Sequence, residues 1–189
     1  NAYTVESTVL TFSQFEHVSG GGLADTFNFM DTNQQVKEYL GGAGDDVFAL
    51  IGSILVPGKI NGQGGTDTLT YADFTTGGVN VNLASGAATA IYGALVGGLS
   101  SIENVIGSVY NDVLTGDIWN NLLDGNDGDD VLDGAEGDDT LLGGLGNDVF
   151  NFLADWGNDV ASDLGGLFDT VNFSAVDTAL LFTLGLGGF

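Results

Sequence analysis

Five nonapeptides follow one another without a gap from Gly107 to Asn151, and this stretch decides the fold. They read GSVYNDVLT (107–115), GDIWNNLLD (116–124), GNDGDDVLD (125–133), GAEGDDTLL (134–142) and GGLGNDVFN (143–151). Each approximates the form Gly-Gly-x-Gly-x-Asp-x-U-x, in which U is a large apolar residue. Glycines suit a tight, crowded turn, and the x-U-x triplet predicts a short strand with one side chain pointing inward. The stretch therefore predicts a β-solenoid in which two units make one coil of 18 residues.

The same signature occurs earlier in the chain, with longer spacing. It appears as GGGLADTFN (20–28), GGAGDDVFA (41–49) and GQGGTDTLT (62–70), whose aspartates Asp25, Asp46 and Asp67 are 21 residues apart. This spacing predicts coils lengthened by three residues, with the three aspartates in one column. We expect a matching column in the second half and place four aspartates in it: Asp112, Asp130, Asp148 and Asp169. The turns on the opposite side would then be 31–35, 52–57 and 72–77, which lack the glycine motif, followed by Asn121, Asp139 and Asp159.

A longer internal similarity divides the chain into two blocks. FSQFEHVSGGGLADTFNF (12–29) parallels LSSIENVIGSVYNDVLTG (99–116). We therefore predict a first block over 1–98 and a second over 99–189, stacked as one continuous solenoid. The least repetitive segment, 75–98, contains VNVNL and ATAIY and is expected to form strands that bridge the blocks.

Charge and composition exclude several classes of function. The chain has 26 acidic residues and only two basic ones, Lys37 and Lys59, for a formal net charge of −24. This charge disfavours nucleic acids and anionic membranes as partners and favours cations. With 43% apolar residues the chain is expected to fold, and with no cysteine it forms neither disulfides nor thiolate metal sites. No apolar run approaches the roughly 20 residues of a transmembrane segment.

The glycine and aspartate turns predict calcium sites. Such a turn offers several backbone carbonyls and ends in a carboxylate, so two stacked turns would supply the hard oxygen ligands that Ca²⁺ prefers. We predict sites between successive turns of a column, at Asp25–Asp46, Asp46–Asp67, Asp112–Asp130, Asp130–Asp148 and Asp139–Asp159, with a further one at Asn121–Asp139, where an amide replaces a carboxylate. The alternative is that these aspartates only cap their turns.

These nonapeptides resemble the RTX, or haemolysin-type calcium-binding repeat, family of bacterial secreted proteins. The resemblance covers most of 20–74 and nearly all of 99–174. It implies an all-β, right-handed parallel β-roll with several Ca²⁺ ions in its turns, and a chain that is exported and folds when calcium binds. It implies a ligand role for Asp46, Asp67, Asp112, Asp130, Asp139 and Asp148, and the columns extend this role to Asp25, Asp159 and Asp169. Leu23, Tyr110 and Trp119 replace the glycine at position four, so turns near 107–121 are expected to hold fewer ions.

Other candidate residues have simpler explanations. His17 occupies a repeated position and is interpreted as structural. Trp119 and Trp156 could form a surface on which a sugar ring stacks, or they could fill turns that lack glycine. Enzymes acting on acidic sugars need positive groups at the substrate, which two lysines supply poorly, so we expect no catalytic role.

The expected function is that of a calcium-dependent structural protein of the bacterial surface or extracellular matrix, such as an adhesin, a surface-layer protein or a filament subunit. The apolar segments Val9–Phe12 and Ala179–Leu184 predict uncapped solenoid ends and head-to-tail self-association. The alternative is a carboxy-terminal export and folding module of a secreted enzyme or toxin, with carbohydrate binding as a further option.

Overall fold

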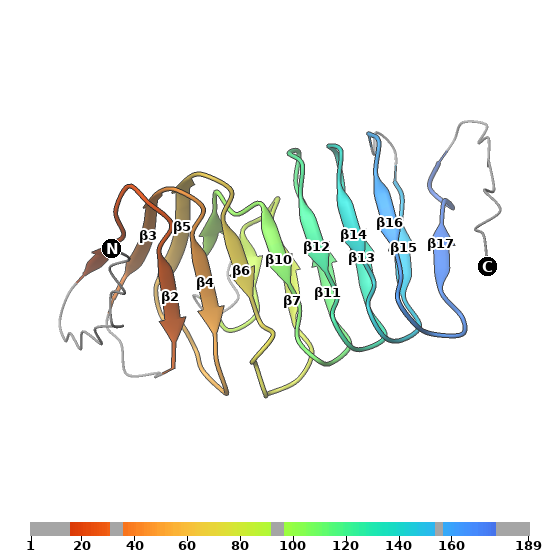
Figure 1. Cartoon of the computed structure of the whole chain (residues 1–189), viewed down its shortest axis with the longest axis horizontal. Coiled ribbons are helices and arrows are strands. Elements are labelled where there is room, and N and C mark those ends of the chain that lie inside the picture. Colours follow the sequence, from red (N-terminus) through yellow and green to blue (C-terminus); the bar gives the residue numbers. More distant parts are fainter. Residues whose placement is uncertain (1–15, 31–35, 92–96, 154–156, 177–189) are drawn as a thin grey trace, which may run out of the picture.

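The computed structural model describes residues 16–30, 36–91, 97–153 and 157–176, and these form a β-solenoid of about seven turns (Figure 1). Every strand pair is parallel except β7 with β8, and no helix occurs within these four ranges. The prediction of an all-β parallel solenoid is therefore confirmed. None of the described segments is a helix of the length and apolarity needed to cross a membrane.

Three sheets run along the solenoid, and we name them by their position. The N-terminal sheet contains β1 (His17–Ser19), β3 (Glu38–Ala43), β5 (Lys59–Gly64) and β9 (Leu99–Ser100). The long sheet contains β2 (Thr26–Phe29), β4 (Val47–Leu50), β6 (Thr68–Thr70), β10 (Asn104–Ile106), β12 (Leu122–Asp124), β14 (Thr140–Leu142) and β16 (Val160–Ser162). The C-terminal sheet contains β7 (Asn80–Asn82), β8 (Ala87–Ala88), β11 (Val113–Thr115), β13 (Val131–Asp133), β15 (Val149–Asn151) and β17 (Thr170–Asn172).

The apolar residue at position eight of each nonapeptide forms the core. Leu114, Leu123, Leu132 and Leu141 are fully buried, and Phe150 is nearly so. Strand register stacks each of them on its counterpart in the next coil, as with Leu123 on Leu141 in the long sheet. The residues on either side are more exposed, because successive side chains of a strand point to opposite faces. The x-U-x triplet therefore forms the predicted strand with its single inward side chain.

The structure corrects the predicted alignment of the two blocks. Asp25, Asp46 and Asp67 each precede a strand of the long sheet, and that sheet continues through β10 and β12. Their column therefore continues through Glu103, Asn121, Asp139 and Asp159. The column of Asp112, Asp130, Asp148 and Asp169 instead precedes the C-terminal sheet, on the other side of the stack.

The error arose from the internal similarity between 12–29 and 99–116. That similarity aligns β1 with β10, but β1 lies in the N-terminal sheet and β10 in the long sheet. The cause is the segment 75–98, whose described part contributes β7 and β8 to the C-terminal sheet before the chain returns to β9 of the N-terminal sheet. One coil is thereby enlarged, and Asp67 and Glu103, which are 36 residues apart in sequence, become neighbours.

Candidate metal sites

Aspartates at position six of successive turns are joined by hydrogen bonds along each column. The backbone N–H of one aspartate donates to Oδ1 of the equivalent residue in the next coil. All six predicted pairs are neighbours of this kind, with distances of 2.8 Å (Asp25–Asp46), 2.7 Å (Asp46–Asp67), 2.7 Å (Asp112–Asp130), 2.9 Å (Asp130–Asp148), 2.8 Å (Asn121–Asp139) and 2.9 Å (Asp139–Asp159). Asp148 donates to Asp169 at 3.1 Å in the same way. Oδ1 of each acceptor is thus satisfied by the protein.

Hydrogen bonding of the remaining side-chain oxygen at position six distinguishes five turns from three others. In five turns this oxygen, Oδ2, is buried, and none of the described residues donates a hydrogen bond to it. These belong to Asp46, Asp67, Asp130, Asp139 and Asp148, which are at most 1% exposed. A buried carboxylate oxygen without a donor is costly unless a cation or a proton meets it. We call these five the open turns.

In three other turns the position-six side chain is satisfied from within the turn. The N–H at position two donates to it, from Gly21 to Asp25 at 2.5 Å, from Ser108 to Asp112 at 2.6 Å and from Asp117 to Asn121 at 2.8 Å. The Ser108 hydroxyl also donates to Oδ1 of Asp112 at 2.8 Å. We call these the closed turns, and in them the position-six side chain caps its own turn.

Backbone conformation at positions two and four separates the open turns from the closed ones. All five open turns have glycine at position four with positive φ (Gly44, Gly65, Gly128, Gly137 and Gly146), and positive φ at position two as well (Gly42, Gln63, Asn126, Ala135 and Gly144). The three closed turns carry Leu23, Tyr110 or Trp119 at position four, and neither position has positive φ. A left-handed position two turns its N–H away from the carboxylate.

This outward N–H finds another acceptor where position two is not glycine. Asn126 donates to the Asp124 side chain at 3.0 Å, and Ala135 donates to Asp133 at 3.1 Å. Position four requires glycine because a Cβ there would strike the preceding coil, as at Gly137, where it would lie 2.7 Å from the carbonyl oxygen of Trp119. Tyr110 and Trp119 instead extend from closed turns and are 42% and 66% exposed. Trp119 therefore does not fill the space left by a missing glycine, which corrects that interpretation for this residue.

The residues of the open turns fit calcium. A Cβ placed on Gly41 would overlap Oδ2 of Asp46 and lie 2.5 Å from the carbonyl oxygen of Gly62. A Cβ on Gly125 would likewise overlap Oδ2 of Asp130, 2.6 Å from the carbonyl oxygen of the next coil. The open turns at Gly41, Gly62 and Gly125 thus direct a carboxylate oxygen and a backbone carbonyl of the following turn at one gap that only glycine leaves free. Oxygen ligands of this kind suit Ca²⁺.

Burial makes these carboxylates costly to ionise. It raises the pKa of Asp130 to about 7 and that of Asp139 to about 6, from an ordinary 3.8, and neighbouring acidic groups add to both shifts. The pKa values of Asp67 and Asp148 are also raised, chiefly by burial. A divalent cation would remove this cost by compensating the charge, so metal binding and folding are expected to be coupled.

Two acidic residues of the columns were missed from the sequence. Glu103 accepts the N–H of Asp67 at 2.8 Å, as an aspartate would, and a Cβ on Gly62 would overlap both Oδ2 of Asp67 and the carbonyl oxygen of Ser101. The signal was available, because counting one nonapeptide back from Gly107 places Glu103 at position six. The second is Asp163, which lies near Asp148 and Asp169.

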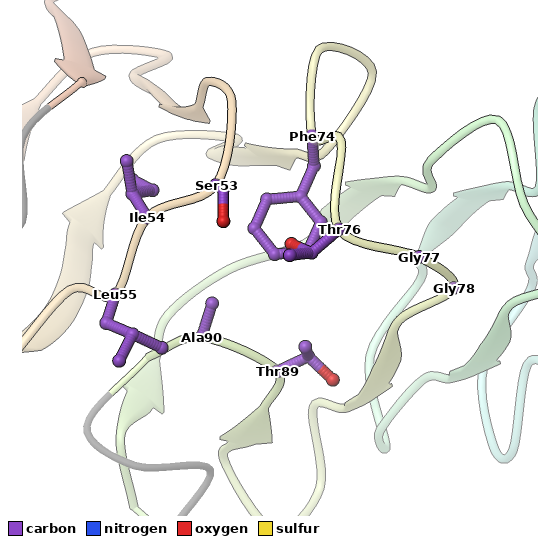
Figure 2. A pocket seen from close by; sticks show the side chains of 9 residues that line it. All are labelled: Ser53, Ile54, Leu55, Phe74, Thr76, Gly77, Gly78, Thr89 and Ala90. Atoms are coloured by element: carbon purple, nitrogen blue, oxygen red, sulfur yellow. The ribbon is translucent and has the colours of Figure 1, made fainter.

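The remaining candidates do not assemble into a second site. His17 pairs with Glu38 at 3.2 Å, and Trp156 lies outside the described residues. A cleft of about 500 Å³ opens between 53–55, 74–78 and 89–90, beside the ring of Phe74 (Figure 2). Its nine lining residues include three hydroxyl groups and no ionisable side chain, so the cleft offers neither a metal ligand nor an acid or base.

Comparison with known proteins agrees with this geometry. A model of the RTX calcium-binding nonapeptide repeat matches residues 120–150 in four copies. The matched range includes three consecutive open turns, 125–130, 134–139 and 143–148. No curated protein matches the chain. Repeats of this family bind calcium and are typical of secreted bacterial proteins. Residues 120–150 of this solenoid therefore carry RTX calcium-binding nonapeptide repeats.

Proposed function

We propose that this chain is a calcium-dependent structural element of a bacterial surface or extracellular protein, such as an adhesin, a surface layer or a filament. The observation that carries the proposal is the set of five open turns, each with a buried carboxylate oxygen that lacks a donor. At a formal net charge of −24, compaction brings these carboxylates together against mutual repulsion. Calcium at each open turn would relieve both the repulsion and the unsatisfied oxygens.

The affinity expected of such sites links folding to export. Extracellular calcium modules bind with a Kd of about 10⁻⁴ to 10⁻³ M, far above the calcium concentration of a cytosol. A chain in that range stays unfolded before export and folds outside the cell. We infer five open-turn ions for residues 41–148, with the closed turns at Asp25, Asp112 and Asn121 contributing weakly or not at all.

A rigid spacer role follows from how the coils stack. The long sheet runs without interruption through both halves (Figure 1), so calcium in successive turns would stiffen the whole described length. The ionisable groups are spread over repeating turns and not gathered in the cleft, which supports a structural role over a catalytic one.

Self-association is part of the proposal. The predicted apolar ends, Val9–Phe12 and Ala179–Leu184, lie outside the described residues. Among the described residues, the turn before β17 carries three apolar side chains that are largely exposed. Leu164, Leu167 and Phe168 are 85%, 86% and 79% exposed. Large exposed apolar side chains at the end of a stack favour contact with another chain, and a head-to-tail contact between copies would build a filament.

Calcium titration tests the main proposal. We expect circular dichroism to show strand formation as calcium is added, loss of that signal on chelation, and native mass spectrometry to count about five ions. Magnesium at the same concentration serves as the control for non-specific screening. A chain whose circular dichroism is unchanged by calcium and by chelation would contradict the proposal.

Sedimentation of the calcium-loaded chain tests self-association separately. We expect species larger than a monomer to grow with protein concentration. A calcium-loaded monomer at high concentration would refute the filament role and favour the export and folding module.

A further inference from the structure

The turn before β17 differs from every open turn in its first residue. Position one is glycine in all five open turns, but Asp163 takes that place in the turn 163–169. The equivalence is structural, because Leu142 pairs with Ser162 and the residues that follow are Gly143 and Asp163. A carboxylate therefore stands beside the carboxylate of the preceding coil, Asp148.

Asp163 places a side-chain oxygen beside the gap at which the turns of Gly41, Gly62 and Gly125 place a backbone carbonyl. A Cβ on Gly125 would lie 2.6 Å from the carbonyl oxygen of Gly143. A Cβ on Gly143 would lie 2.5 Å from Oδ2 of Asp148 and 2.8 Å from Oδ1 of Asp163. A charged ligand thus replaces a neutral one at the equivalent gap.

The protein holds Asp163 in this position. Its Oδ2 accepts the N–H of Gly165 at 3.0 Å, which leaves Oδ1 directed at Asp148. Oδ1 of Asp163 and Oδ2 of Asp148 are both buried, and no donor among the described residues reaches either one. Asp148 itself is 0% exposed. Two facing carboxylates without donors require a cation or a shared proton between them.

Asp169 completes a group of three. One ligand oxygen from each of Asp148, Asp163 and Asp169 lies within 4.8 Å of the others. Calcium binds oxygen at about 2.3 to 2.6 Å, so ligands on opposite sides of one ion lie about 5 Å apart. The three oxygens therefore fit around a single Ca²⁺.

We propose that Asp148, Asp163 and Asp169 form a three-carboxylate calcium site that binds more tightly than the other open turns. The proposal rests on the proposed calcium binding of those turns and adds Asp163, a ligand that the nonapeptide pattern does not contain. A third carboxylate increases the attraction for a divalent ion, and ligand charge is one of the features by which proteins set calcium affinity. Within this chain the site would fill first as calcium rises.

Isothermal titration calorimetry of the full chain tests the assignment. The variants are Asp163→Asn, which keeps the shape of the side chain, and Asp163→Gly, which introduces the residue found in the open turns. Asp127→Asn is the matched control, because Asp127 is an exposed acid on the same column of turns and its loss changes net charge equally. Circular dichroism at saturating calcium checks that each variant folds.

We expect the wild-type chain to show one calcium ion bound more tightly than the rest. Both Asp163 variants should weaken that ion at least about tenfold, while Asp127→Asn leaves it within about twofold. If Asp163→Asn and Asp163→Gly keep the tight ion, the assignment of Asp163 is wrong, even though the other turns bind calcium. If the wild-type chain binds no calcium at all, the general proposal fails as well.

Discussion

The calcium-free protein should become less stable as pH rises, and calcium should reverse this dependence. Burial raises the pKa of Asp130 to about 7 and that of Asp139 to about 6, whereas both titrate near 3.8 when unfolded. The folded state therefore binds more protons than the unfolded state between these values. Stability from these groups is fully present below about pH 4 and is lost as pH rises through 6 and 7.

The size of the effect follows from the two shifts. After discounting for residual water access, Asp130 and Asp139 together should lower the free energy of unfolding by about 2 to 4 kcal/mol between about pH 4 and about pH 8. Asp67 and Asp148 act in the same direction, because burial raises their pKa values too. Such a loss is a large part of the stability of an ordinary domain.

Urea unfolding followed by circular dichroism measures this directly. In calcium-free buffer the urea concentration at the unfolding midpoint should fall from about pH 5 to about pH 8. With calcium the midpoint should rise over the same interval, because the metal binds the deprotonated carboxylates.

The Asp130→Asn variant isolates the contribution of one carboxylate. Its amide does not titrate, so the calcium-free dependence on pH should become shallower, while overall net charge changes little. A calcium-free stability that stays level or rises from about pH 5 to about pH 8 would refute the argument that these carboxylates are buried without compensation.

Three further predictions concern single turns. Gly125→Ala places a methyl group in the gap of an open turn, so native mass spectrometry should count one calcium ion fewer than in the wild-type chain. Gly22→Ala is the control, because no atom lies within 4 Å of its Cβ, and it should leave the count unchanged. Equal counts in the two variants would contradict the assigned gap. The double change Ser108→Gly with Tyr110→Gly should open a closed turn, and calorimetry should detect one additional ion; an unchanged stoichiometry would show that glycine at positions two and four does not suffice. Because burial raises the pKa of Glu103, Glu103→Gln should stabilise the calcium-free chain at neutral pH and weaken its response to calcium. Urea unfolding with and without the ion measures both effects, and a calcium-free variant less stable than wild type would count against this.

The sequence predicted the repeating unit well because each of its residues acts locally. Position eight had to be buried and position six had to end a turn, and both predictions required only one coil and its neighbour. The stacking of Leu123 on Leu141 and the hydrogen bond from Asp130 to Asp148 follow from a constant 18-residue period. Spacing within a block was therefore enough to pair the aspartates.

Alignment across the middle segment was not predictable in the same way. The similarity between 12–29 and 99–116 indicates that both segments form a strand, a turn and a second strand. The sequence pattern of such a unit is the same whichever sheet its strands join. Only the pairing of β7 with β11 and of β5 with β9 reveals that 75–98 adds strands to the C-terminal sheet before β9 rejoins the N-terminal sheet, within one enlarged coil. Such pairings depend on contacts between distant residues, which a local pattern does not contain.

The sequence indicated only in part which position-six carboxylates are free of hydrogen bonds from their own turn. The missing glycine at Tyr110 and Trp119 marked these turns as unusual, and the structure shows their position-six side chains satisfied from within. The positive φ of Asn126 and Ala135 could not be predicted from the sequence, because neither residue type requires that conformation. Their conformation is stabilised by Asp124 and Asp133, two residues earlier in the chain.

Position five adds a set of hydrogen bonds that does not need calcium. Oδ1 of Asn111 accepts the N–H of Asp129 at 3.1 Å, and Oδ1 of Asp129 accepts the N–H of Asn147 at 2.8 Å. These bonds run opposite to those of position six, since the earlier coil supplies the side chain. Position five lies toward solvent, so its oxygens need no cation, whereas the buried position-six oxygens of the open turns have no donor among the described residues. We therefore expect calcium dependence to come mainly from position six of the open turns, because the backbone conformation at positions two and four leaves those carboxylate oxygens without a donor from their own turn.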